Sequence, residues 1–196
     1  MTNVVLTGVG GQGIVLASTM LVEAAFEAGY DVKANEVHGM AQRGGSVVAQ
    51  VRFGEKVFSP LVPLGQADFL VALEEVEALR YAGYLRIDGV AIVNLRRVVP
   101  VTVSAGDARY PEDVDKRLRT RFEGRLVLVE GERLAREAGN VRTENVVLLG
   151  VLSRFLEIPL QLWEGVIAHL APKRAVEANL RAFSLGRRVG YFGVPN

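Results

Sequence analysis

One polar segment of the sequence gathers side chains that can transfer protons and bind anions. It runs Glu36-Val37-His38-Gly39-Met40-Ala41-Gln42-Arg43-Gly44-Gly45-Ser46. Imidazole titrates near neutral pH, so His38 is a candidate general base. The guanidinium of Arg43 can bind a carboxylate or phosphate through two parallel hydrogen bonds. The glycines let the backbone bend here, which is typical of a functional loop and not of a core element.

The sequence gives little support for catalysis by this segment alone. Ser46 lies close to His38 but lacks the residues that surround a nucleophilic serine. The second histidine, His169, falls on a late predicted helix, so the spacing offers no metal site. The alternative is that His38 and Arg43 only hydrogen bond to carbonyl groups and hold the loop. We expect no catalytic and no metal-binding residue, and a loop facing a partner or an active site, formed by His38, Met40, Gln42, Arg43, Gly44, Gly45 and Ser46.

A second glycine-rich stretch, Gly8-Val9-Gly10-Gly11-Gln12-Gly13, follows a predicted strand and opens a predicted helix. The spacing Gly8-x-Gly10-x-x-Gly13 in this context matches the dinucleotide fingerprint, in which a phosphate lies at the helix N-terminus. Glu36, near the end of the next predicted strand, is a possible ribose partner. The alternative is a tight turn without a ligand. We expect an anion- or ligand-binding loop formed by Gly8, Gly10, Gly11, Gln12 and Gly13.

Strands and helices alternate around these loops. Strands are predicted at residues 4–7, 31–37, 47–53, 56–59, 69–73, 90–94 and 126–129. Helices are predicted at residues 14–28, 74–81, 111–122, 132–138 and 146–156, and from Pro159 and Pro172 onward.

This alternation predicts an α/β three-layer sandwich that is Rossmann-like, with a mostly parallel sheet and a helical C-terminal region. An expected hairpin between residues 47–53 and 56–59 makes the sheet mixed. The helix at 146–156 is apolar nearly all round, so it must lie in the core or at a subunit interface. With 196 residues, 49% hydrophobic and 23% charged, we expect residues 1–196 to form a single domain.

Charge and cysteine content narrow the classes of function. The net charge of +1 gives no reason to expect nucleic-acid binding. Residues 1–115 hold 9 Lys and Arg against 14 Asp and Glu, and residues 116–196 hold 14 against 8. This asymmetry means either two solvated faces or a basic surface that binds an acidic partner. The absence of cysteine excludes disulfides and any cysteine-ligated iron–sulfur cluster or zinc site in this chain.

No signal peptide and no apolar run of about 18 residues is apparent. We therefore expect a cytoplasmic location and no contact with a membrane.

The two loops together resemble the gamma subunit or domain of 2-oxoacid:ferredoxin oxidoreductases. The resemblance extends over nearly the whole chain and includes Ser59-Pro60, Glu74-x-x-Glu77-Ala78-Leu79-Arg80 and Asn145-Val146-Val147-Leu148-Leu149-Gly150. The sequence from His38 to Ser46 looks like the beta-subunit form found in the indolepyruvate branch of this family.

The resemblance implies an enzyme that oxidatively decarboxylates a 2-oxoacid to an acyl-CoA with thiamine diphosphate and passes electrons through iron–sulfur clusters to ferredoxin. It places the thiamine and the clusters in a larger partner subunit. This chain agrees, because it has no cysteine and lacks the Gly-Asp-Gly and Asn-Asn thiamine signature, which Gly106-Asp107-Ala108 does not supply. We expect no cofactor in this chain, contact with ferredoxin only through that subunit, and no activity of the chain alone.

Two alternatives to an indolepyruvate or arylpyruvate enzyme stay open. The first is the gamma subunit of a pyruvate, 2-oxoisovalerate or 2-oxoglutarate:ferredoxin oxidoreductase. The second belongs to another class, a stand-alone Rossmann-like nucleotide-binding protein or dehydrogenase that uses the first glycine loop.

Overall fold

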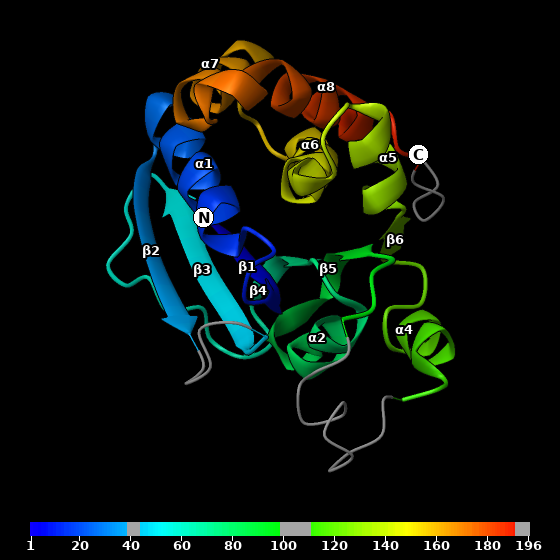
Figure 1. Cartoon of the computed structure of the whole chain (residues 1–196). Helices are drawn as coiled ribbons and strands as arrows, with labels where there is room; N and C mark the ends of the chain where they lie inside the picture. Colours follow the sequence, from blue (N-terminus) through cyan, green and yellow to red (C-terminus); the bar gives the residue numbers. More distant parts are fainter. Residues whose placement is uncertain (39–43, 99–110, 191–196) are drawn as a thin grey trace.

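The computed structural model describes residues 1–38, 44–98 and 111–190 (Figure 1). Its centre is a six-stranded sheet in the order β2-β3-β1-β4-β5-β6. The strands are β1 (Thr2–Val9), β2 (Asp31–His38), β3 (Ser46–Gly54), β4 (Ala67–Ala72), β5 (Leu85–Asn94) and β6 (Leu126–Val129). β1, β4, β5 and β6 run parallel, and β3 runs antiparallel to both β1 and β2.

Helices cover both faces of this sheet (Figure 1). One face carries α1 (Ile14–Glu27), α5 (Gly131–Glu137), α6 (Glu144–Leu152), α7 (Leu160–Leu170) and α8 (Val176–Arg187). The other face carries α2 (Glu75–Arg80) and α4 (Val114–Arg121). Short 3-10 turns lie at η1 (Ala82–Tyr84), η2 (Val141–Thr143), η3 (Ser153–Phe155) and η4 (Lys173–Ala175). Each face has its own buried apolar cluster, so the predicted three-layer α/β sandwich with a mixed sheet is confirmed.

The apolar helix near residue 150 belongs to the core. Every residue of α6 from Asn145 to Leu152 is buried, between the sheet and the helices α1, α5 and α8. α6 and α8 approach closely where Gly150 faces Gly186. A Cβ atom at Gly186 would collide with the carbonyl group of Val147, and one at Gly150 would collide with that of Phe183. Two helix backbones can come this close only where side chains are absent.

One predicted strand pairing is wrong. Residues 56–59 form no strand, and the Val57 N–H instead donates to Asp31 Oδ2 at 2.8 Å. β3 pairs with β1 on one side and with β2 on the other, from Asp31↔Gly54 to His38↔Val47. Both edges of β3 are therefore occupied, and a third partner has no backbone groups to pair with. The hairpin of this fold is β2–β3, closed through the second glycine-rich segment.

Several helix boundaries also differ from the predicted ones. α4 begins at Val114, so Pro111 precedes the helix, and α6 begins at Glu144 and ends at Leu152. Pro159 is the N-cap of α7 rather than its first residue. Among the residues described here, no helix combines the length and the apolar content needed to cross a bilayer.

Candidate functional site at the carboxyl edge of the sheet

The two glycine-rich loops meet at one edge of the sheet. β1 ends at Val9, opposite Ser46 at the start of β3. The Gly10 N–H donates to the Gly45 carbonyl oxygen at 2.8 Å. β2 ends at the same edge of the sheet as β1, and β3 starts from that edge in the antiparallel direction. Gly45, which comes just before β3, therefore lies beside the end of β1.

Gln12 ties the first glycine loop to the sheet through its side-chain amide. Its Oε1 accepts from the Val9 N–H at 2.7 Å, and its Nε2 donates to the Leu73 carbonyl at 2.8 Å. The amide therefore bonds to the backbone of this chain at the ends of β1 and β4. A Cβ at Gly8 would lie 2.7 Å from Gln12 Oε1, so a side chain there would displace this amide from its place.

The N-terminus of α1 leaves hydrogen-bond donors free beside this turn. Gly11 and Gly13 have φ angles of 103° and 78°, a conformation that glycine adopts without strain. Within the described part of the chain, neither the Gly11 nor the Gly13 N–H has an acceptor. Such groups, together with the helix dipole, favour an anion.

A cavity of about 480 Å³ adjoins these donors. It lies at the carboxyl ends of β1 and β4. The chain leaves β1 toward β2 and β3 on one side of the sheet, and it leaves β4 toward β5 on the other side. Ligands of open α/β sheets bind at such switch points. The lining residues are Gly11, Gln12, Gly13, Leu16, Leu73, Arg96, Val98, Val141, Arg142, Glu144 and Asn145.

The two arginines of the cavity differ in their charge environment. Arg96 pairs with Glu132 and lies 3.7 Å from Glu144 Oε1. The pKa of Glu132 lies below that of an ordinary glutamate, because Arg136 donates a hydrogen bond to it and Arg96 adds its positive charge. Glu132 therefore stays ionised and offsets Arg96. Arg142 is exposed and forms no ion pair with a described residue, so its guanidinium is available to a ligand in the cavity.

Asn145 adds an unsatisfied acceptor to the cavity lining. It is 3% exposed, and its Nδ2 donates to the Gly13 carbonyl at 3.0 Å. Its buried Oδ1 has no donor among the residues that the structure describes. A buried acceptor is costly to leave unpaired, so a ligand or water that donates there is favoured. The sequence signal for this residue is an asparagine immediately before a long apolar run.

The second loop is described only at its two ends. His38 ends β2, and Gly44, Gly45 and Ser46 lead into β3. The Ser46 hydroxyl donates to Glu77 Oε2 at 2.5 Å and lies 3.2 Å from the Tyr81 hydroxyl. The side chain of His38 and the predicted residues Met40, Gln42 and Arg43 lie outside the described residues, as does Gly106-Asp107-Ala108.

The expectation that Glu36 binds a ribose is not met by its position. Glu36 lies on β2, which β3 separates from β1, whereas the dinucleotide site requires the acidic residue on the strand next to β1. Glu36 Oε1 instead accepts from the Ser18 hydroxyl at 2.5 Å. Spacing along the sequence was correct, but the inserted antiparallel strand moves this carboxylate aside.

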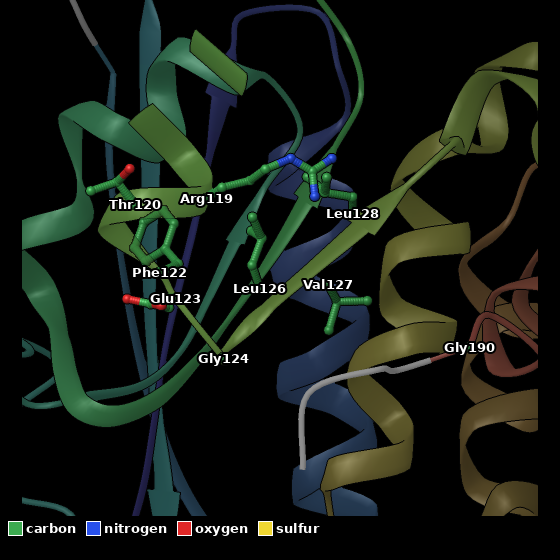
Figure 2. A pocket seen from close by; sticks show the side chains of 9 residues that line it. All are labelled: Arg119, Thr120, Phe122, Glu123, Gly124, Leu126, Val127, Leu128 and Gly190. Carbon is green, nitrogen blue, oxygen red and sulfur yellow. The ribbon is translucent and has the colours of Figure 1, made fainter. Parts of the chain in front are cut away.

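A larger cavity, of about 630 Å³, lies between α4 and β6 (Figure 2). Its cation, Arg119, already pairs with Asp115 at 3.0 Å, and this contact raises the pKa of the guanidinium. Figure 2 shows the side chains of Arg119 and Glu123 pointing in different directions. Polar groups do not converge here, in contrast to the cavity at the glycine loop. The described residues contain no cluster of three or more metal-ligating side chains.

The class of protein to which this fold and its paired glycine loops belong follows from comparison with known proteins. The model of the pyruvate ferredoxin/flavodoxin oxidoreductase family matches residues 3–189, and the chain belongs to this family. Over 188 residues it is 47% identical to the indolepyruvate oxidoreductase subunit IorB of Pyrococcus horikoshii, covering 94% of this chain and 93% of that protein. The predicted resemblance to the indolepyruvate branch is thereby confirmed.

Two more distant relatives extend the comparison. The common gamma subunit of the pyruvate and ketoisovalerate oxidoreductases of Pyrococcus abyssi is 30% identical over 156 residues, covering 79% of this chain and 77% of that protein. The crystal structure of the pyruvate oxidoreductase subunit PORC of Thermotoga maritima superposes with a TM-score of 0.71 at 27% identity, covering 94% of each chain. The chain is thus related to small subunits of 2-oxoacid oxidoreductases throughout its described length.

Proposed function

We propose that this chain is the non-cofactor-bearing subunit of an indolepyruvate or arylpyruvate:ferredoxin oxidoreductase, with residues 1–196 forming one gamma-type domain. The observation that carries this proposal is the 47% identity to an indolepyruvate oxidoreductase subunit over 94% of the chain. Identity to the gamma subunit named for pyruvate and ketoisovalerate is only 30%. The pyruvate, 2-oxoisovalerate and 2-oxoglutarate enzymes are therefore the second choice.

Selection of the oxoacid is assigned to a larger partner subunit. One relative is named as a common gamma subunit of two oxidoreductases with different substrates. A subunit shared by two enzymes cannot determine which substrate each enzyme accepts. We propose the same division of roles for this chain and its partner. The larger subunit would hold thiamine diphosphate and the iron–sulfur clusters, would pass electrons to ferredoxin, and would work with this chain in the cytoplasm.

The role proposed for this chain is to bind a ligand and to orient it. The glycine loop of residues 8–13 offers free N–H donors, Arg142 offers positive charge, and Asn145 offers a buried acceptor. These groups suit a ligand with both a phosphate and a hydrogen-bond donor. Coenzyme A, the acyl acceptor implied for this reaction, has both. The second loop, residues 38–46, is assigned to the contact with the larger subunit or with its active site.

The stand-alone dehydrogenase is the weaker alternative. It is favoured by the glycine loop and its cavity, but the Glu36 carboxylate lies on the wrong strand to bind a ribose beside β1. A nicotinamide nucleotide would lack the contact that normally fixes its adenosine half.

Reconstitution with the larger subunit tests the proposal. The chain is co-expressed with a larger subunit that bears the thiamine signature and cysteine-rich ends, and dye reduction is measured with indolepyruvate, pyruvate and 2-oxoglutarate in the presence of coenzyme A. We expect turnover only with both subunits, highest with indolepyruvate. The isolated chain should be colourless and free of metal. A stoichiometric cluster in the isolated chain, or turnover without the partner, would refute the assignment.

A further inference from the structure

The β2–β3 hairpin is fastened to helices on both faces of the sheet at the end that bears the second glycine loop. On one face, the Ser18 hydroxyl of α1 donates to Glu36 Oε1 of β2 at 2.5 Å. On the other face, the Ser46 hydroxyl of β3 donates to Glu77 Oε2 of α2 at 2.5 Å. Figure 1 shows α1 and α2 on opposite sides of the sheet. We call these contacts the two serine–glutamate pairs.

The first pair holds an edge strand. Among the strands that the structure describes, β2 pairs with β3 alone and lies at the edge of the sheet. Ser18 is 1% exposed, and its oxygen lies 2.5 Å from Glu36 and 2.9 Å from the Val15 carbonyl. A serine has one hydroxyl proton, and a carboxylate is the stronger acceptor of the two. The pair therefore ties β2 to α1 close to where the strand ends.

The second pair is part of a closed network. Glu77 is 5% exposed, and its second oxygen accepts from Arg80 Nε at 3.0 Å. The Ser46 hydroxyl donates its one proton to Glu77. In its contact with the Tyr81 hydroxyl at 3.2 Å, Ser46 is therefore the acceptor and Tyr81 the donor. Each polar atom of the pair thus has a defined partner. A network in which each polar atom is paired fixes a geometry more firmly than a single bond does.

We propose that Glu36 and Glu77 are positioning residues that set the orientation of the hairpin end, and with it the contact between the two glycine loops and the approach to the larger subunit. This inference rests on the proposed function of the second loop. Gly44 and Gly45 have no side chains with which to pack, and the pairing of β3 with β1 ends at Val9↔Ser46, just after them. The orientation must therefore come from the residues that flank them, and the serine–glutamate pairs supply it from both faces.

The Gly10 amide reports this orientation directly, because its N–H bonds to the Gly45 carbonyl. Its hydrogen-exchange rate is measured by NMR in the isolated chain for Ser18→Ala, Glu77→Gln and the double variant. Each single change should speed exchange about tenfold, which corresponds to about 1.4 kcal/mol, and the double change should speed it further. Unchanged exchange at Gly10 in both single variants would overturn the proposal.

Matched controls separate positioning from general loss of stability. Glu75→Gln alters a glutamate of the same helix that is also 5% exposed and paired with an arginine, Arg97. Thr19→Val removes the neighbouring hydroxyl of α1, which donates to the Val15 carbonyl at 2.8 Å. Both controls should leave Gly10 exchange as in the wild type, whatever their melting temperatures. Equal acceleration in the controls would show that the pairs have no special role.

The assembled enzyme supplies the second readout. The pair variants should require a higher concentration of this chain to saturate the larger subunit and should lower kcat, with little change in KM for the oxoacid. If Gly10 exchange rises while assembly and kcat stay at wild-type values, the positioning role for the enzyme is refuted. If the wild-type pair of subunits does not oxidise indolepyruvate, the proposed function fails instead, and the exchange data distinguish the two outcomes.

Discussion

Gly10 and Gly45 are joined by a backbone hydrogen bond of 2.8 Å, although they belong to different loops. Neither residue has a side chain, so the contact depends only on where the backbone is held. Gln12 holds it on one side and Ser46 on the other. This hydrogen bond therefore links the first glycine loop, where a ligand would bind, to the segment that we assign to the contact with the larger subunit.

Replacing Gln12 by alanine should lower the free energy of unfolding by about 1–3 kcal/mol, because the Val9 N–H and the Leu73 carbonyl lose their partner. Chemical denaturation of the isolated chain measures this change. Gln161→Ala is the matched control, since Gln161 is exposed on α7, and it should stay within about 0.5 kcal/mol of the wild type. Equal effects of the two changes would remove the structural role given to Gln12.

Replacing Gly186 by alanine should destabilise the fold by about 1–3 kcal/mol or more, because the new Cβ collides with the Val147 carbonyl of α6. Gly165→Ala on α7 is the contrasting change. A Cβ there meets no atom within 4 Å, and alanine in a helix should stabilise the chain by about 0.4–1 kcal/mol. Thermal melting of both variants gives the test, and a loss of stability of the same size in both would contradict it.

The pKa of the Glu132 carboxyl should lie below the ordinary value for glutamate in the folded chain. The pKa is lowered because the folded state favours the charged form of this carboxyl group. The stabilisation is fully present above the ordinary pKa, and it is lost as the pH falls through the lower, folded pKa. Carbon NMR of the carboxyl group follows the titration. Arg136→Gln removes the main cause and should move the midpoint upward, whereas a midpoint unaffected by this change would refute the stated cause.

Replacing Arg43 by alanine should abolish or strongly reduce activity of the assembled enzyme while leaving the melting temperature of the isolated chain nearly unchanged. A guanidinium in a glycine-flanked polar segment suits an anionic group or a carboxylate of the partner. Melting and reconstituted turnover are measured side by side. A large fall in melting temperature with full activity of the complex would show that Arg43 serves only its own loop.

The isolated chain should bind NAD weakly or not at all, because Glu36 bonds to Ser18 and lies two strands from β1. Isothermal titration calorimetry measures the affinity. Inorganic phosphate serves as the comparison, since a free helix N-terminus can attract any small anion without recognising a nucleotide. Micromolar affinity for NAD would favour the dehydrogenase over the oxidoreductase subunit.

Local pattern was sufficient to predict most elements of this fold, and long-range pairing was not. The runs at 4–7, 90–94 and 126–129 are short and apolar, and all three lie in strands of the sheet. The hairpin was assigned to the wrong partner because hydrophobic alternation in residues 47–53 identifies a strand without telling which neighbours occupy its two edges. The pairing depends on register with β1, which lies far away in the sequence.

The candidate site shows the same division. Both glycine loops were apparent from residue types, since glycine, histidine and arginine clusters are unusual in a core. The cavity residues come from two separate parts of the chain, Arg96 from one and Arg142 and Asn145 from the other, and only the folded sheet brings them beside Gly13. No spacing rule relates them, so the sequence alone offered no means of grouping them.

The antiparallel register of β2 and β3 also decides how freely the second loop can change in evolution. The two strands are paired from Asp31↔Gly54 to His38↔Val47, so residues inserted or deleted beyond these pairs alter the connection without shifting any side chain of the sheet to the other face. The connection between β2 and β3 could therefore be exchanged as a unit. Glu36 and Ser46, each bonded to a helix, mark the boundaries at which a segment from a relative acting on another oxoacid could be transplanted.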